Sequence, residues 1–243
     1  MKKKGIDWQV GSSGFHYKEW KEVFYPKGLA ANKWFRYYST HFNTIETNVS
    51  FYRLPLLSTL EKWYNDSPGD FTFCVKASRL ITHYKRFKDT GSALEVFYNL
   101  IRKGLQEKLA CILFQFPPDY AYTPERLAAI ISGVDPSFNN VTEFRHISWW
   151  NKDVYRELAK HSITFCNISH PKFPDEIVST SPLFYFRFHG VPVLYKSVYS
   201  QAYLDDIIKK IRRRPGIKTA YLYFNNTWGT GAIENMGYIK TRL

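Results

Sequence analysis

Along the chain, short segments of alternating apolar and polar residues take turns with longer segments whose apolar residues recur at helical spacing. The first kind predicts β-strands and the second predicts amphipathic α-helices. The predicted strands are 8–15, 44–51, 71–76, 111–116, 141–145, 163–168, 184–189 and 220–225. The predicted helices are 32–42, 57–64, 93–109, 123–131, 151–161 and 201–213, with a last helix that begins near Ala232.

Residues typical of helix starts support several of these boundaries. Ser92 with Glu95 three residues later has the pattern of a capping box for the helix 93–109. Thr123-Pro124 joins a capping residue to a first-turn proline. By contrast, the segment 170–182 after the sixth strand holds three prolines, which predicts an ordered loop in place of a helix.

The alternation of strands and helices favours a parallel sheet whose two faces are both covered. The length of 243 residues is close to the ~250 residues of a typical (β/α)8 barrel. We therefore predict an α/β fold in which residues 1–243 form a single TIM-like barrel domain, with eight parallel strands and an irregular segment after the sixth. An open, doubly wound sheet is the alternative.

Within the predicted strands, one set of alternate positions is apolar and the other turns polar toward the C-terminal end. In the seventh strand, Phe186 and Phe188 alternate with Arg187 and His189. The second, third, fourth, fifth and eighth strands follow the same rule, so their polar ends would converge on the C-terminal mouth, where barrel proteins bind ligands. Solvated rim positions or a structural ion-pair network are the alternative, but the number of strands involved favours a ligand site.

The inward polar set includes two acids, Glu46 and Glu143, and a lysine, Lys76. A lysine in a partly buried mouth must be paired or lose its proton, so Lys76 is either an ion-pair strut or an acid/base or Schiff-base residue. Either glutamate could be a general base, and the sequence does not decide between them. These three are the candidate catalytic residues. Alanine at either glutamate is then expected to abolish turnover while the melting temperature stays nearly unchanged.

Candidate ligand-binding residues come from the same strand ends and the loops after them. Arginine suits recognition of carboxylate or phosphate, and Arg187 lies on the seventh strand, after which barrels frequently bind phosphate. The glycine-bearing loop 225–231, before the last helix, is a second such place. The full set is Asn48, Tyr52, Gln115, Arg145, Trp149, Arg187, His189, Asn225 and Asn226.

Composition narrows the class of protein. The chain is 44% hydrophobic and 23% charged, which excludes a disordered protein. No apolar run reaches the ~18 residues of a membrane span, and no apolar segment follows the basic start at residues 1–5, so a cytoplasmic protein without a signal peptide is expected. The three cysteines lie in apolar, strand-like runs without C-x-x-C spacing, which is typical of buried reduced thiols.

Charge indicates the kind of partner. The net charge of +13 attracts polyanions, so we expect a small anionic or phosphorylated ligand, with nucleic acid as the alternative. Lys85, Arg86 and Lys88, after the third strand, are well placed for a polyanion near the mouth. A membrane partner is not expected, and the oligomeric state is unknown.

No cofactor is predicted from the sequence. His83, His170 and His189 follow predicted strands, and carboxylates lie nearby, so a zinc or manganese site is an alternative. The histidines have no short-range ligand spacing, which makes this divalent-metal interpretation the weaker one.

Several strand-end motifs carry a family resemblance. They are VGSSGF at 10–15, NTIETN at 43–48, SFY at 50–52, FTFCVK at 71–76, QFPP at 115–118, EFR at 143–145, RFHG at 187–190 and YFNN at 223–226. Together they span nearly the whole chain, and they resemble the YecE-like family, the domain of unknown function 72. The resemblance implies a TIM-like barrel with a polar C-terminal mouth and no settled activity.

The family is often compared with barrel nucleases of the endonuclease IV type, which is an analogy of fold. The family usually has an aspartate at the end of strand six. In this chain the corresponding position is Asn167 or one of the residues next to it. Our first hypothesis is an enzyme, a hydrolase or lyase, acting on an anionic ligand by acid/base chemistry. The alternatives are a nucleic-acid-binding protein or nuclease relative, and a barrel that binds a metabolite without catalysis.

Overall fold

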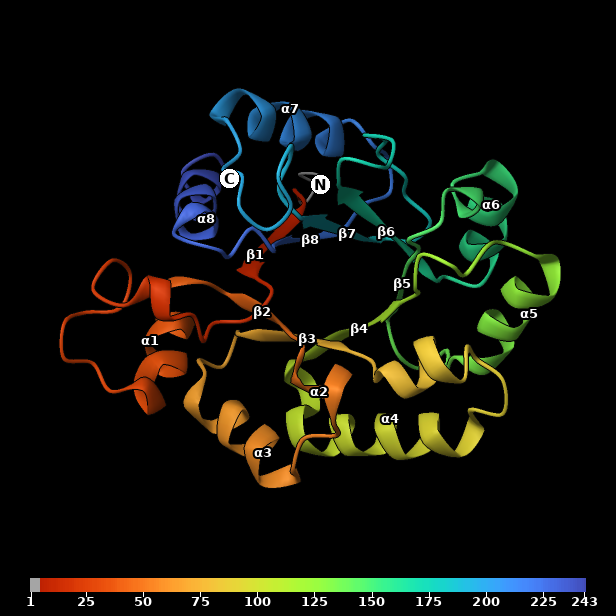
Figure 1. Ribbon diagram of the computed structural model, residues 1–243, viewed down its shortest axis with the longest axis horizontal. Helices are drawn as coiled ribbons and strands as arrows, with labels where there is room; N and C mark the ends of the chain where they lie inside the picture. Colours follow the sequence, from red (N-terminus) through yellow and green to blue (C-terminus); the bar gives the residue numbers. More distant parts are fainter. Residues whose placement is uncertain (1–4) are drawn as a thin grey trace.

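The computed structural model describes residues 5–243, so the basic residues 1–4 lie outside the described part of the chain. Eight parallel strands form a nearly closed barrel with helices around it (Figure 1). The hydrogen-bonded order is β1-β8-β7-β6-β5-β4-β3-β2, and β1 lies beside β2. The predicted TIM-like barrel is thus confirmed, and the open sheet is wrong.

The strands are β1 (Asp7–Ser12), β2 (Thr44–Thr47), β3 (Thr72–Lys76), β4 (Leu109–Gln115), β5 (Asn140–Glu143), β6 (Thr164–Ser169), β7 (Leu183–Phe188) and β8 (Thr219–Phe224). The α-helices are α1 (Trp34–His41), α2 (Val49–Tyr52), α3 (Leu57–Asp66), α4 (Gly91–Leu105), α5 (Pro124–Gly133), α6 (Lys152–Lys160), α7 (Gln201–Arg212) and α8 (Gly231–Lys240). Each predicted strand is present, although several end earlier than predicted, the first two by three or four residues.

Two local features explain the early strand ends. The chain turns after β1 at Gly14, whose φ of +106° favours glycine. The last part of the predicted second strand is helix α2, a single turn that places Phe51 and Tyr52 at the mouth. The Ser50 hydroxyl of this turn donates to the Lys76 carbonyl oxygen at 2.5 Å, which ties α2 to the end of β3.

The helix-start predictions had mixed outcomes. Thr123 is the N-cap of α5, and its side chain accepts from the Arg126 N–H, as predicted. The capping box at Ser92 is wrong, because α4 begins at Gly91 and Ser92 lies inside its first turn. The chain enters this helix directly from Thr90, whose carbonyl oxygen accepts from the Leu94 N–H at 2.8 Å.

The irregular segment between β6 and β7 is confirmed and is held by strand side chains. The Asn167 amide accepts from the Val178 N–H at 2.7 Å and donates to the Val178 carbonyl oxygen at 2.9 Å. Thr180 in turn accepts from the Phe165 N–H at 2.8 Å. Asn167 is therefore a buried structural residue that fastens this segment, and its amide is not part of the mouth.

Side chains close the barrel between β1 and β2, which share no backbone ladder. The Tyr38 hydroxyl of α1 accepts from the Ser12 N–H at 2.8 Å and donates to the Thr44 carbonyl oxygen at 3.2 Å. Gly11 is required at this seam, because a Cβ there would lie 2.1 Å from the Thr44 carbonyl oxygen.

The core has two layers, as the alternation in the strands predicts. The outer layer packs residues such as Phe73, Phe114 and Phe186 against the helices. The barrel interior is filled by Cys74, Cys111, Leu113, Val141, Cys166, Ile168, Tyr185, Tyr221 and Tyr223. All three cysteines are buried and free, which confirms the predicted thiols. Within residues 5–243, no helix has the length and apolarity needed to cross a bilayer.

Candidate functional site at the barrel mouth

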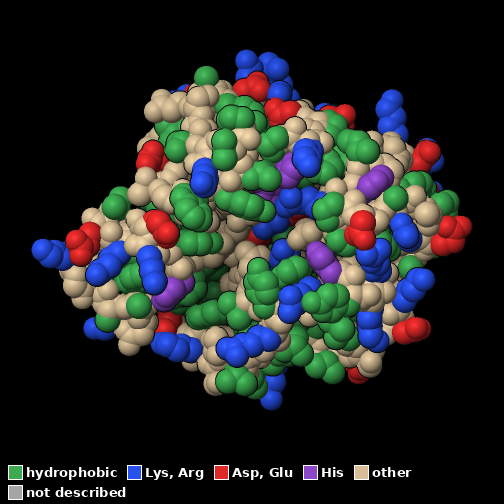
Figure 2. Space-filling model, viewed as in Figure 1, with side chains coloured by type: hydrophobic (Ala, Val, Ile, Leu, Met, Phe, Trp, Pro, Cys, Tyr) green, Lys and Arg blue, Asp and Glu red, His purple; other side chains and the backbone are tan. Residues whose placement is uncertain are grey.

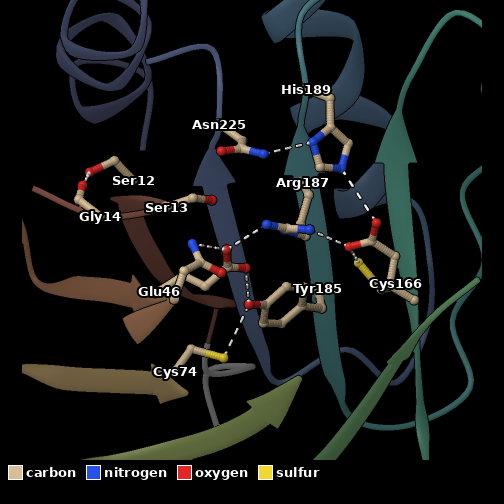
Figure 3. Close-up of polar contacts among 12 residues, drawn as sticks. Ser12, Ser13, Gly14, Glu46, Cys74, Cys166, Tyr185, Arg187, His189 and Asn225 are labelled. Carbon is tan, nitrogen blue, oxygen red and sulfur yellow. Dashed lines mark hydrogen bonds and ion pairs between the residues drawn. The ribbon is translucent and has the colours of Figure 1, made fainter. Parts of the chain in front are cut away.

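Arg187 lies at the centre of a buried ion-pair network above the inner core (Figure 3). Its Nη2 donates to Glu46 Oε1 at 2.7 Å, and its Nη1 donates to Glu143 Oε2 at 2.5 Å. These side chains are at most 3% exposed. Strand ends that are distant in the sequence therefore bring both predicted acids and an arginine together.

Further contacts hold both carboxylates in place. The Tyr185 hydroxyl, from within the barrel, donates to Glu46 Oε2 at 2.6 Å. Arg145 forms an ion pair with Glu143 through Nε and Oε1. Each glutamate is thus bound to a guanidinium group, and Glu143 is bound to two.

Burial and charge shift the pKa values of Glu143 and His189 in this network. Burial raises the pKa of the Glu143 carboxyl, but Arg145 and Arg187 outweigh burial and hold that pKa well below its usual range. Burial, reinforced by Arg145, lowers the pKa of His189 well below its usual range, so its imidazole is neutral at pH 7. The neutral ring lies between the Arg145 guanidinium, 2.9 Å from Nε2, and the Asn225 amide, 3.0 Å from Nδ1.

Beside the network lies a cavity of about 530 Å³, which we call the mouth cavity. This volume is within the range of small-molecule sites. Its polar wall includes Ser13, Asn48, Lys76, Arg187 and Asn225, and its aromatic wall includes Phe15, Tyr17, Phe51, Tyr52 and Tyr195. Figure 2 shows the same side of the molecule, hollowed near its centre, where basic side chains lie among hydrophobic ones.

Lys76 enters the mouth cavity from the end of β3 and is 9% exposed. Its Nζ lies 3.9 Å from the centroid of the Phe51 ring and forms no hydrogen bond or ion pair within residues 5–243. Burial and the nearby Arg187 lower the pKa of Lys76 to about 8. Lys76 is therefore a nearly buried amine that has no polar contact among the described residues.

Three residues that line the mouth cavity also carry a buried polar atom without a partner among the described residues: Ser13 Oγ, Asn48 Oδ1 and Arg187 Nε. In Figure 3 the Ser13 hydroxyl points toward Arg187. Buried polar atoms are almost always hydrogen-bonded in native proteins. Three of the six such atoms among the described residues belong to residues that line this one cavity, as is expected of a ligand site.

Among the predicted binding residues, Arg145 and His189 belong to the network beside the mouth cavity but do not line it. Trp149 and Asn226 belong to neither the network nor the cavity lining. Trp149 is fully buried, stacks on Phe144 with ring centroids 4.0 Å apart, and donates to the Tyr120 carbonyl oxygen. It belongs to the outer core, because Phe144 points outward from the barrel. Asn226 is also fully buried, and its amide donates to Ser197 and Asn235, which fixes the loop before α8.

Two further predictions need correction. Gln115 at the end of β4 donates to the Phe116 carbonyl oxygen and does not line the mouth cavity. The glycine-bearing loop 225–231 contributes only Asn225 to the mouth cavity. Gly231 has a packing reason instead, since a Cβ there would lie 2.9 Å from Val198.

Ser13, Tyr17, Phe51 and Tyr195 line the mouth cavity but were absent from the predicted set. Strand alternation would have found Ser13, because it lies within the predicted first strand, 8–15, and follows Gly11 on the inward face. The aromatic residues lie in turns and loops after the strands, whose course the strand pattern does not determine.

Within residues 5–243, the structure does not bring together the ligands that the divalent-metal alternative needs. Among residues 5–243, no group of three or more His, Cys, Asp or Glu side chains is arranged to hold an ion. The two inward carboxylates, Glu46 and Glu143, already bind guanidinium groups. Burial lowers the pKa of His83 and of His170 to about 4, so both rings are in the neutral form that metals bind, but among the described residues neither ring belongs to a group of three or more such side chains.

A parallel eight-stranded barrel with a ligand-sized polar cavity at the carboxyl ends of its strands places this protein among the TIM-like barrel proteins. The chain belongs to the family described as "Protein of unknown function DUF72", whose model matches residues 9–243. This confirms the resemblance found in the sequence.

Relatives and solved structures agree with this membership. The UPF0759 protein YunF of Bacillus subtilis (strain 168) is 27% identical over 252 residues, with 88% of each chain covered. A DUF72 family protein of Thermotoga maritima, TM1631, has a crystal structure that matches with a TM-score of 0.86 and 28% identity, covering 97% of this chain and 99% of its own. The DUF72 family protein EF0366 of Enterococcus faecalis matches at 18% identity with a TM-score of 0.82, covering 96% and 94%, and shows the fold alone.

Proposed function

We propose that this protein is an enzyme, a hydrolase or lyase, that binds a small anionic, phosphorylated ligand in the mouth cavity and acts on it by proton transfer. The observation that carries the proposal is the group of unpartnered buried atoms on Ser13, Asn48 and Arg187. Leaving such an atom unsatisfied costs about 1–3 kcal/mol. A ligand that supplies the missing partners recovers this free energy on binding.

The unpartnered atoms indicate the chemistry of the ligand. Arg187 Nε is a donor, and Lys76 Nζ offers further donors, so the ligand needs acceptor oxygens. Asn48 Oδ1 is an acceptor, so the ligand also needs a donor such as a hydroxyl group. A hydroxylated phosphate satisfies both requirements.

Charge balance favours an anion. The carboxylates of Glu46 and Glu143 are matched by the guanidinium groups of Arg187 and Arg145. The charge of Lys76 is the surplus at the mouth cavity, because its ammonium group has no ion-pair partner in the described chain. An anionic ligand would neutralise it in a setting of low polarity, where the attraction is strong.

The geometry also assigns different roles to the three candidate catalytic residues. We assign proton transfer to Lys76, since its amine borders the mouth cavity and titrates near neutral pH. Glu46 and Glu143 orient Arg187 instead, as both are fully buried and bound to it. A nearly unchanged melting temperature on replacing either glutamate by alanine does not fit such a network.

Titration calorimetry with inorganic phosphate and ribose 5-phosphate tests the proposal. We expect Lys76→Met to weaken binding by about 10- to 100-fold, the usual effect of losing a charge-assisted hydrogen bond. Lys172→Met is the matched control, because this exposed lysine follows β6 and lies outside the mouth cavity. Equal losses in both variants would mean that only the general positive field attracts the anion, and would overturn the proposal.

The nucleic-acid alternative is tested in the same titration with a short single-stranded oligonucleotide. Two of the basic side chains predicted to meet a polyanion have partners already, as Lys85 donates to the Asp89 carbonyl oxygen and Arg86 pairs with Asp119. Oligonucleotide binding that falls linearly on a log–log salt plot and is equal in both variants would instead indicate a polyanion on the rim.

A further inference from the structure

We propose that Lys76 is a nucleophile that forms an imine with a carbonyl group of the substrate. This inference rests on the proposed function, because the same anchors hold the substrate. It narrows the substrate class to small, hydroxylated aldehydes or ketones that carry a phosphate group. The evidence is the placement of the amine, the state of its neighbours and the contacts that it lacks.

A second buried lysine, Lys108, shows which contacts a structural amine makes in this protein. Lys108 is 6% exposed, and its Nζ donates to the Tyr64 carbonyl oxygen at 2.7 Å and to the Ser67 carbonyl oxygen and hydroxyl at 2.9 Å. Lys76 is almost as buried, yet within the described residues its Nζ has only the face of Phe51. The missing contacts are therefore specific to the lysine that borders the mouth cavity.

The surroundings keep part of the Lys76 population neutral. Both nearby carboxylates, Glu46 and Glu143, are bound to arginines, so neither pairs with the ammonium group. With a pKa of about 8, about a tenth of the Lys76 amines carry a lone pair at pH 7. Nucleophilic lysines are activated in this way, by burial and by a neighbouring cation.

The step balances without any further reactant. The Lys76 nitrogen lone pair attacks the carbonyl carbon, a C–N bond forms, and the carbonyl oxygen takes one proton from the amine. Loss of the second amine proton and departure of the oxygen as water leave a C=N bond. Protonated, this imine withdraws electrons from the neighbouring carbon, as in lyase reactions that break or form a carbon–carbon bond.

Reductive trapping tests the inference. The whole protein is incubated with dihydroxyacetone phosphate or glyceraldehyde 3-phosphate and sodium cyanoborohydride, and the modified lysines are mapped by peptide mass spectrometry. We expect Lys76 to be modified about tenfold more than any exposed lysine, because bound substrate has a high effective concentration. Dihydroxyacetone without phosphate should modify Lys76 less, and added inorganic phosphate should protect it.

A Lys76→Arg variant is the matched control, since it keeps the positive charge but cannot form the imine. It should yield no adduct in the peptide that contains position 76. If wild type binds phosphate through Lys76 but gives no adduct there, the imine is overturned and the proposed function stands. If Lys76 is modified equally with and without phosphate on the carbonyl compound, the imine stands and the proposed anion site is overturned.

Discussion

Replacing Arg187 by methionine is expected to destabilise the protein by about 3–5 kcal/mol, because it removes the shared partner of two buried carboxylates. Glu46 and Glu143 are both fully buried, so water cannot take over the role of the guanidinium group. For a chain of this length the loss corresponds to a melting temperature lower by about 10 °C. Urea unfolding at pH 7 measures it.

The sign of the pH dependence follows from Glu143. Its carboxyl has a folded-state pKa well below the usual 4.5, so its stabilising effect is present above pH 4.5 and is lost as the pH falls through the folded-state value. Without Arg187, less positive charge opposes the effect of burial, so the pKa of Glu143 should be higher in the variant than in the wild type, although Arg145 still pairs with it. The stability gap between wild type and Arg187→Met should therefore narrow as the pH falls from 7 to about 4.

The matched control for this prediction is a surface arginine. Arg242 pairs with Asp205, but the two side chains are 51% and 38% exposed. Arg242→Met should destabilise the protein far less than Arg187→Met, because exposed ion pairs contribute little to stability. Similar, small losses in both variants would contradict a network that depends on Arg187.

Replacing Lys76 by methionine is expected to make the protein more stable, by about 1–3 kcal/mol at pH 7. A buried ammonium without a partner opposes folding, and methionine fills similar space without a charge. Because burial lowers the pKa of Lys76 from 10.5 to about 8, the penalty is full below pH 8 and disappears as the pH rises past 10.5. The advantage of the variant should shrink between these values.

Lys108→Met is the opposite case and the best comparison. Lys108 makes three hydrogen bonds, so its loss leaves acceptors at Tyr64 and Ser67 without a partner and should cost about 1–3 kcal/mol. Thermal and urea unfolding of both variants show directly whether each substitution raises or lowers the free energy of unfolding. Destabilisation by Lys76→Met as large as that by Lys108→Met would show that Lys76 is a structural strut.

The strand pattern was sufficient to predict the barrel and the convergence of its polar ends. Alternation assigns Arg187 and Glu143 to the inward face whatever the loops do, since one residue of slip would turn every side chain around. The same argument correctly placed Lys76 at the mouth. The ion pairs could not be predicted from the sequence, because which glutamate contacts which arginine depends on how the strands are arranged across the barrel.

Most of the wrong predictions of site residues concern loops. Trp149 and Asn226 follow strand ends, as mouth residues do, but both turn into the packing between strands and helices. Phe51 reaches the mouth cavity only because α2 forms where the pattern predicted more strand. These outcomes depend on tertiary packing, which local alternation does not record.

A crystal structure of the protein with inorganic phosphate, collected near pH 7, tests the central claim most directly. We predict phosphate oxygens within hydrogen-bond distance of Lys76 Nζ, Arg187 Nε and the Ser13 hydroxyl, with the bonds from Arg187 to Glu46 and Glu143 intact. A mouth cavity that holds only water at saturating phosphate, with Lys76 turned to solvent, would contradict it.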